Sequence, residues 1–184
     1  MSDRQSPESV LELEKLALTV ASCLAETGRR LVLAESCTGG LAAAALATIP
    51  GISRGFCGSA VTYRDQTKID WLDVAVSDLA RVSAVSREIA GQMAVGVLRH
   101  TSEADVAVSI TGHLGPDAPP DGDGTVWIGM AYRTREGISE PTARQHTLSE
   151  TTRIPRQYEA AATLLRQAVR QIRGLAHSKI PAPN

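Results

Sequence analysis

Apolar residues recur every three to four positions along several stretches of the chain, a spacing that places them on one face of an α-helix. The first stretch follows Ser6 and Pro7, where Ser6 can cap a helix and Pro7 loses no hydrogen bond at the first position. Gly28 can take the left-handed conformation that ends this helix. The pattern predicts further helices at 41–49, 86–100 and 155–172, and a turn with a short helix at 64–72.

Two short runs of apolar residues, 31–34 and 106–110, have the continuous pattern of strands that are buried on both faces. Such strands need helices on both sides of their sheet. A third strand is expected at 59–63. Two further strands, 125–132 and 142–148, are expected to form a hairpin.

The alternation of strands and helices, followed by a hairpin, predicts an α/β fold: a three-layer α/β/α sandwich with a mixed sheet. One domain is expected over residues 1–176, followed by a disordered tail at 177–184. In such folds ligands bind at the carboxyl ends of the strands. The polar loops 35–40 and 111–124 both follow predicted strands, so we expect them to meet at one pocket.

Composition narrows the classes of function. Of the 184 residues, 43% are hydrophobic and 21% charged, and the net charge is −1, so a nucleic-acid or anionic-membrane partner is not expected. Three cysteines without CxxC spacing do not suggest a disulfide framework or a zinc site. The polar N-terminus and the lack of a long apolar run predict a soluble, cytoplasmic protein.

The strongest local signal is the segment Glu35-Ser36-Cys37-Thr38-Gly39-Gly40, between a predicted strand and a predicted helix. A serine at such a turn is lifted out of the sheet, and the backbone N–H groups that open the next helix point to where an oxyanion would form. The two glycines let a substrate approach the backbone. The alternative is that Ser36 or Thr38 only caps the helix, and the hexapeptide alone does not decide between the two.

A nucleophilic serine needs a base, and the four histidines form no recognisable triad pattern. Lys68 is one of only three lysines and follows the strand ending at Tyr63 by five residues. A lysine base must be neutral, which requires burial. Taken alone, Lys68 also fits a solvated helix position. Cys37 offers a thiol alternative to Ser36, although a buried, inert cysteine is the commoner case.

The loop 111–124 is rich in glycine, proline and aspartate. Its first residues could present hydroxyl and N–H groups to a phosphate. The side chains of His113, Asp117, Asp121 and Asp123 could be read as metal ligands, but Asp and Pro in such loops more often form turns, so no metal is expected.

Several motifs occur in a fixed order that resembles the C-terminal domain of the competence/damage-inducible protein CinA, over residues 11–172. They are Ala34-Glu35-Ser36-Cys37-Thr38-Gly39-Gly40, Pro50-Gly51, Val61-Thr62-Tyr63 with Lys68 following, Ala84-Val85-Ser86, Thr111-Gly112, Gly115-Pro116 and Gly124-Thr125-Val126-Trp127-Ile128.

The resemblance implies a nicotinamide-nucleotide amidase, which converts nicotinamide mononucleotide to the acid and ammonia in pyridine-nucleotide salvage. Ser36 would be the nucleophile, Lys68 its base and Tyr63 an orienting or relaying group, with no cofactor. N–H groups near Thr38 would hold the oxyanion. The implied substrate-binding residues are Glu35, Cys37, Thr38, Gly39, Gly40, Thr111, Gly112 and Arg156. A homo-oligomer is also implied.

The chain departs from the family pattern after Thr111-Gly112. The family's usual glycine-rich, lysine-bearing stretch is replaced by 113–123, which carries aspartates and no lysine. Aspartates near a phosphate would repel it, so either this loop points away or the substrate is less anionic than a mononucleotide. Two alternatives therefore stay open: the same machinery acting on another small carboxamide, and a non-catalytic nucleotide-binding or regulatory module.

Overall fold

The computed structural model describes residues 6–119 and 122–177. Its α-helices are α1 (Pro7–Thr27), α2 (Leu41–Ala47), α3 (Asp65–Leu72), α4 (Val76–Val82), α5 (Arg87–His100) and α6 (Arg153–His177), with a 3-10 turn η1 (Ile52–Arg54). Its strands are β1 (Leu31–Glu35), β2 (Phe56–Val61), β3 (Val106–Gly112), β4 (Thr125–Thr134), β5 (Gly137–Ile138) and β6 (Thr142–Thr147).

The strands form one mixed sheet, as the sequence predicted. β1 lies between β2 and β3 and runs parallel to both. β4 continues the sheet antiparallel to β3 and pairs in turn with β6 and the short β5, which confirms the predicted hairpin. The carboxyl ends of β1, β2 and β3 therefore lie at the same end of the sheet.

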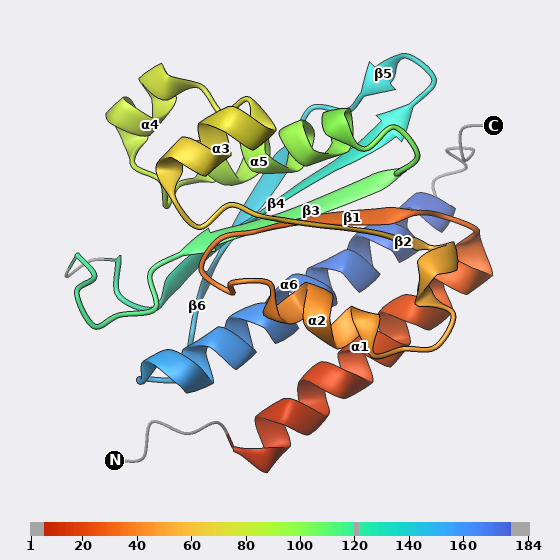
Figure 1. Cartoon of the computed structure of the whole chain (residues 1–184), viewed down its shortest axis with the longest axis horizontal. Coiled ribbons are helices and arrows are strands. Elements are labelled where there is room, and N and C mark those ends of the chain that lie inside the picture. Colours follow the sequence, from red (N-terminus) through yellow and green to blue (C-terminus); the bar gives the residue numbers. More distant parts are fainter. Residues whose placement is uncertain (1–5, 120–121, 178–184) are drawn as a thin grey trace.

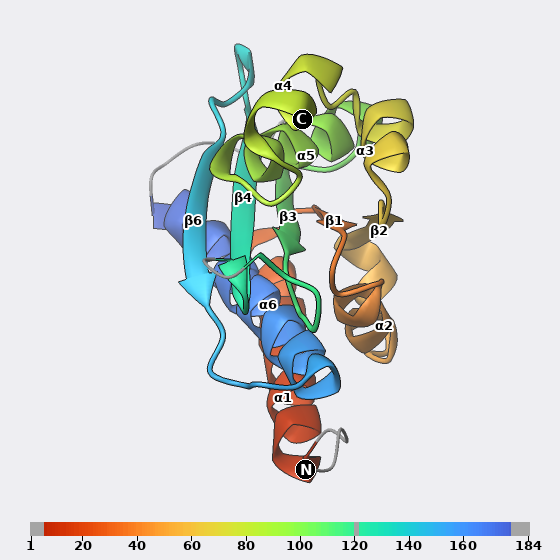
Figure 2. The ribbon, with the colours of Figure 1, turned by 90° about the vertical axis from the view of Figure 1, so that its left-hand side faces the viewer.

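Helices cover both faces of the sheet, which confirms the three-layer α/β/α arrangement (Figures 1 and 2). One face packs against α1, α2 and α6, and its apolar cluster includes Leu31 and Leu33 of β1. The other face packs against α3 and α5, with α4 beside them, and its cluster includes Val32 and Ala34. Adjacent residues of β1 point to opposite faces and both faces are buried, which explains the unbroken apolar run.

Local signals fixed several helix ends. Ser6 caps α1 by accepting a hydrogen bond from the backbone of Ser9, and Gly28 ends it with φ of 66°. Ser86 caps α5 in the same way through the backbone N–H of Ile89. None of the helices in the described parts of the chain is long and apolar enough to cross a membrane.

Some predicted bounds were wrong. The strand expected at 59–63 is β2, which begins at Phe56 and ends at Val61, and the chain bulges between its first two pairings with β1. α4 was not expected; it has only seven residues, none of them fully buried, and only Leu79 and Val82 pack at the edge of the core. α6 begins at Arg153, two residues before the predicted start. The predicted tail lies outside the described residues, except for His177 at the end of α6, and the domain limits 1–176 stay a prediction.

The layer of α3 and α5 depends on close backbone approach at Gly96. A Cβ atom there would lie 2.0 Å from the carbonyl oxygen of Leu72, at the end of α3. Gly174, in α6, faces open space, with nothing within 4 Å of the corresponding position. The two glycines therefore make a matched pair.

We predict that Gly96→Ala lowers the free energy of unfolding by about 3 kcal/mol, because the clash with a backbone atom outweighs the gain in helix propensity. Gly174→Ala should instead raise it by about 0.5–1 kcal/mol. Urea denaturation of both variants measures the difference. An equal, stabilising effect of both substitutions would contradict the close packing of α3 on α5.

Candidate active site

A cleft of about 450 Å³ lies at the carboxyl ends of β1, β2 and β3. Its walls come from the turn after β1, the segment after β2, the loop after β3 and the start of α6. The lining residues are Ser36, Cys37, Tyr63, Gly112, His113, Leu114, Gly115, Pro116, Asp117, Ala118 and Arg153. The two polar loops that the sequence singled out therefore meet, as predicted.

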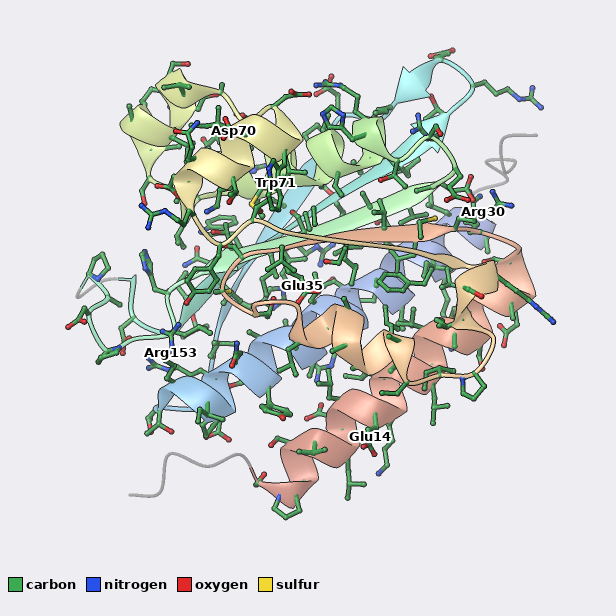
Figure 3. The ribbon with its side chains drawn as sticks, in the orientation of Figure 1. Glu14, Arg30, Glu35, Asp70, Trp71 and Arg153 are labelled. Atoms are coloured by element: carbon green, nitrogen blue, oxygen red, sulfur yellow. The ribbon has the colours of Figure 1, made fainter. Side chains whose placement is uncertain are left out.

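The carboxylate of Glu35 organises the turn that carries Ser36. Glu35 is fully buried, and four donors from three segments surround it. Its Oε2 accepts hydrogen bonds from the Thr38 hydroxyl at 2.8 Å and the backbone N–H of Ala42 at 3.1 Å. Its Oε1 accepts from the backbone N–H of Ala43 at 2.9 Å and the Ser59 hydroxyl at 3.1 Å. In Figure 3, Glu35 lies between β1 and α2.

This arrangement corrects the expectation that the N–H groups opening α2 form the oxyanion site. Those of Ala42 and Ala43 are already bonded to Glu35, so the helix end is occupied by a carboxylate of the chain. The N–H groups of Cys37 and Thr38, just before the helix, donate to no backbone oxygen of the described residues and face the sulfur of Cys37. Glu35 thus positions the turn. It does not line the cleft, in contrast to the substrate contact that the resemblance implied.

Backbone geometry explains the paired glycines. Gly39 and Gly40 both have positive φ, 63° and 93°, and a Cβ on Gly40 would lie 3.2 Å from Val61. The turn is also held from α6, because the side-chain amide of Gln157 donates to the carbonyl of Thr38 at 2.9 Å. Thr38 itself is buried and hydrogen-bonded to Glu35. Neither Thr38 nor the two glycines are among the residues that line the cleft.

Ser36 lies at the cleft wall and continues the ladder between β1 and β3, with its N–H donating to the carbonyl of Ile110 at 3.0 Å. Its hydroxyl has no hydrogen bond to any described residue, so it does not cap α2. The neighbouring thiol is different: burial raises the pKa of Cys37 to about 12. A thiol with that pKa is protonated at neutral pH, which disfavours the thiol alternative.

Lys68 is not a solvated helix residue. It is only 2% exposed, and its Nζ forms an ion pair with the carboxylate of Asp65 at 3.1 Å. Its positive charge also lowers the pKa of Cys37, so the amine lies within electrostatic reach of the turn that carries Ser36. In the described part of the chain Nζ is bonded to Asp65 and not to Ser36.

Two arginines at the start of α6 have different surroundings. Arg153 lines the cleft and donates to the Tyr63 hydroxyl at 2.6 Å and to the carbonyl of Gly115 at 2.7 Å, both neutral acceptors. Figure 3 shows it beside the loop after β3. Arg156 is buried and forms a two-pronged ion pair with Asp123, at 2.6 and 2.8 Å.

The substrate-binding role that the resemblance implies for Arg156 is therefore not favoured by the structure. Asp123 neutralises Arg156, and the same hydrogen bonds hold the pKa of Asp123 below its usual range. Among the described carboxylates, none forms an ion pair with Arg153. Of the two arginines, Arg153 is thus the one whose charge faces the cleft.

Of the other residues that the sequence singled out, some line the cleft and others do not. Gly112 lines the cleft, whereas the Thr111 hydroxyl is buried and donates to the carbonyl of Ala84 at 2.8 Å. Of the four side chains read as possible metal ligands, Asp121 lies outside the described residues. Over residues 6–119 and 122–177, no three His, Cys, Asp or Glu side chains are grouped to hold a metal ion.

Sequence reasoning missed the positioning roles of Glu35, Gln157 and Arg153. No local motif marks Gln157 or Arg153, because both act on segments more than 35 residues away. The Glu35 role had a signal, since a glutamate followed by a turn and a helix start can satisfy the orphan N–H groups of that helix.

We predict that Glu35→Gln lowers the free energy of unfolding by about 2–3 kcal/mol, because an amide offers one accepting oxygen where four donors converge. The measurement is urea denaturation. Glu26→Gln, on the exposed face of α1, is the matched control and should change the value by less than about 0.5 kcal/mol. Equal effects of the two substitutions would show that Glu35 does not hold the turn.

Known proteins resemble the chain in both sequence and structure. A model of the CinA C-terminal domain matches residues 13–169. The nicotinamide-nucleotide amidohydrolase PncC of Enterobacter agglomerans is 37% identical over 161 residues, which are 86% of this chain and 94% of that protein. A CinA-like protein of Trichodesmium erythraeum is 42% identical over 120 residues, but these are only 28% of its length, so the chain spans less than a third of that longer relative.

Crystal structures of two relatives have the same fold. A CinA superfamily protein from Klebsiella pneumoniae superposes with a TM-score of 0.80 at 29% identity, covering 88% of this chain and 98% of that one. A competence/damage-inducible protein from Agrobacterium tumefaciens superposes with a TM-score of 0.79 at 30% identity, covering 92% and 98%. The chain belongs to the CinA C-terminal domain family.

Proposed function

We propose that the chain is an amidohydrolase that converts nicotinamide mononucleotide to nicotinate mononucleotide and ammonia, with Ser36 as nucleophile and Lys68 as base. The observation that carries the proposal is the unbonded hydroxyl of Ser36 at the cleft wall, together with the buried Lys68, whose charge acts on the adjacent Cys37. The name of the Enterobacter relative, matched over 94% of its length, supports this choice of reaction.

The proposed acylation step uses Ser36 and Lys68 in turn. The Ser36 oxygen attacks the carboxamide carbon while its proton passes to the neutral amine of Lys68. The C–O bond forms and the carbonyl oxygen becomes an oxyanion. The N–H groups of Cys37 and Thr38, which have no backbone acceptor among the described residues, can stabilise that charge.

Lys68 then returns the proton to the departing nitrogen, the C–N bond breaks, and ammonia leaves. Water attacks the acyl-enzyme while its proton passes to Lys68. Lys68 then protonates the Ser36 oxygen as the acyl C–O bond breaks, and nicotinate mononucleotide is released. Because Lys68 is 2% exposed, solvent competes little for its lone pair. Nζ forms an ion pair with Asp65, so the amine must leave this contact to act as base.

The remaining cleft residues would bind the rest of the substrate. Tyr63 presents a half-exposed aromatic ring, which suits a cationic pyridinium. Arg153 holds the Tyr63 hydroxyl and carries a charge that no described carboxylate neutralises, which suits a phosphate. Both assignments are part of the proposal.

A second substrate class is favoured by Asp117, whose carboxylate lines the same cleft. A negative charge there disfavours a phosphate and is compatible with an unphosphorylated carboxamide, such as the corresponding nucleoside. Asp123 does not add to this repulsion, because Arg156 neutralises it. The balance between Arg153 and Asp117 therefore decides which carboxamide is preferred.

The reaction is tested by ammonia release from nicotinamide mononucleotide. Ser36→Ala and Lys68→Met are expected to lower kcat at least about a thousandfold, while Cys37→Ser keeps activity because the thiol is not the nucleophile. Lys15→Met, on the exposed face of α1, is the matched lysine control and should be fully active.

Release that survives in Ser36→Ala would refute the serine mechanism. A wild type that releases no ammonia from the mononucleotide or from other carboxamides would favour the non-catalytic binding module.

The substrate class is tested by Arg153→Met. We expect KM for the mononucleotide to rise about tenfold or more, the effect of losing about 1.4 kcal/mol of binding, with little change for the unphosphorylated nucleoside. The guanidinium of Arg166 pairs with Glu12 away from the cleft, so Arg166→Met should leave both KM values unchanged. An equal loss on both substrates would exclude a phosphate contact by Arg153.

A further inference from the structure

Three hydroxyl side chains form a row across the sheet at the level of the nucleophile. β1 pairs with β2 through Glu35 and Val61, and with β3 through Glu35 and Ile110. One residue further on, Ser36 is flanked by Thr62 on one side and Thr111 on the other. The hydrogen bonds from Thr62 N–H to the carbonyl of Glu35, and from Ser36 N–H to Ile110, continue both ladders to this level.

The row faces the α3 and α5 layer. The preceding row consists of Ala60, Ala34 and Ser109, and the Ser109 hydroxyl donates to the carbonyl of Ala90 in α5. Side chains two residues apart on a strand point to the same face, so the row of Thr62, Ser36 and Thr111 lies on that side too. The hydrogen bond from the Thr111 hydroxyl to the carbonyl of Ala84, just before α5, agrees with this. Lys68 belongs to α3, in the same layer.

Within the row, only the Thr62 hydroxyl is both sealed from solvent and without a partner. Thr62 is 0% exposed, and its Oγ1 has no hydrogen bond in the described structure. The Thr111 hydroxyl is bonded to Ala84, and Ser36 opens to the cleft. Burying a hydroxyl without a partner costs stability, and a valine of nearly the same shape would avoid that cost.

Lys68 has the complementary capacity. A lysine ammonium has three N–H donors, and one of them is used by Asp65 at 3.1 Å. Asp65 is on the solvent side, 61% exposed, so its ion pair draws the amine away from the sheet. A lysine that acts on Ser36 must turn from Asp65 toward the sheet, where the Thr62 hydroxyl is an acceptor.

Resting on the proposed function, we propose that Thr62 is a positioning residue of the reaction. Its Oγ1 accepts a hydrogen bond from Nζ of Lys68 once the amine has turned from Asp65, and so directs the amine's lone pair at the Ser36 hydroxyl. When the Ser36 proton moves to Nζ, the same oxygen stabilises the ammonium until the proton passes to the leaving nitrogen. Thr62 gains and loses no proton overall.

The test is Thr62→Val, which removes the hydroxyl and keeps the shape. We expect kcat for ammonia release to fall tenfold or more, with KM within twofold, while the thermal midpoint stays the same or rises. Thr62→Ser should restore most of kcat. Thr163→Val, which removes a buried hydroxyl on α6, is the control and should keep full kcat.

A Thr62→Val variant that keeps kcat within twofold of wild type overturns the proposal. So does a loss that Thr62→Ser does not restore.

A second readout does not depend on the substrate. Phenylmethanesulfonyl fluoride sulfonylates an activated serine: the Ser36 O–S bond forms, the S–F bond breaks, fluoride leaves and the serine proton passes to Lys68. Peptide mass spectrometry follows the modified Ser36. We expect labelling tenfold or more slower in Thr62→Val than in wild type, and restored in Thr62→Ser.

The two assays separate the hypotheses. If Ser36 labelling depends on Thr62 but the wild type releases no ammonia from any carboxamide, the proposed reaction is refuted and the positioning role of Thr62 is kept. Equal labelling rates in Thr62→Val and wild type, or no labelling of Ser36 in wild type, overturn the role of Thr62.

Discussion

The buried carboxylate of Glu35 ties together the parts on which the cleft depends. It belongs to β1, accepts from Ser59 of β2, from the first turn of α2 and from Thr38 in the turn between them. A carboxylate can stay buried when several donors converge on it, and each of these donors would otherwise lack a partner. Because the next residue is Ser36, the contact that stabilises the central layer also fixes the direction in which this proposed nucleophile leaves the sheet.

Charge is distributed unevenly around this centre. Arg156 and Asp123 neutralise one another and fasten the loop after β3 to α6. Arg153, one helical turn earlier, holds the same loop through the carbonyl of Gly115 and keeps its charge available at the cleft. Lys68 is buried and forms an ion pair with the exposed carboxylate of Asp65. Arg156 thus has a structural contact, whereas the proposed function uses Arg153 and Lys68.

Much of the fold could be predicted because its signals are local. The buried strands β1 and β3 read as apolar runs, and Ser6, Gly28 and Ser86 mark helix ends. α4 gave a weaker signal because it is short and packs only Leu79 and Val82 at the edge of the core. The predicted cleft followed from the rule that loops gather at the carboxyl ends of parallel strands.

The site was less predictable, for a physical reason. Ser36 and Lys68 stand in motifs, but their surroundings come from contacts distant in sequence. Whether Arg153 or Arg156 faces the cleft depends on where Asp123 folds back, and three residues of sequence cannot show this. Register pairs Thr62 with Ser36, and only the packed structure leaves the Thr62 hydroxyl without a partner.

The central claim, that Ser36 forms a covalent bond with its substrate, is tested most directly by acid-quenching the enzyme during turnover of nicotinamide mononucleotide and measuring peptide masses. We expect a nicotinate-mononucleotide acyl group on the peptide that contains Ser36, and none in Ser36→Ala. Ammonia release with no acylated peptide at any time, or with the acyl group on Cys37, would contradict it.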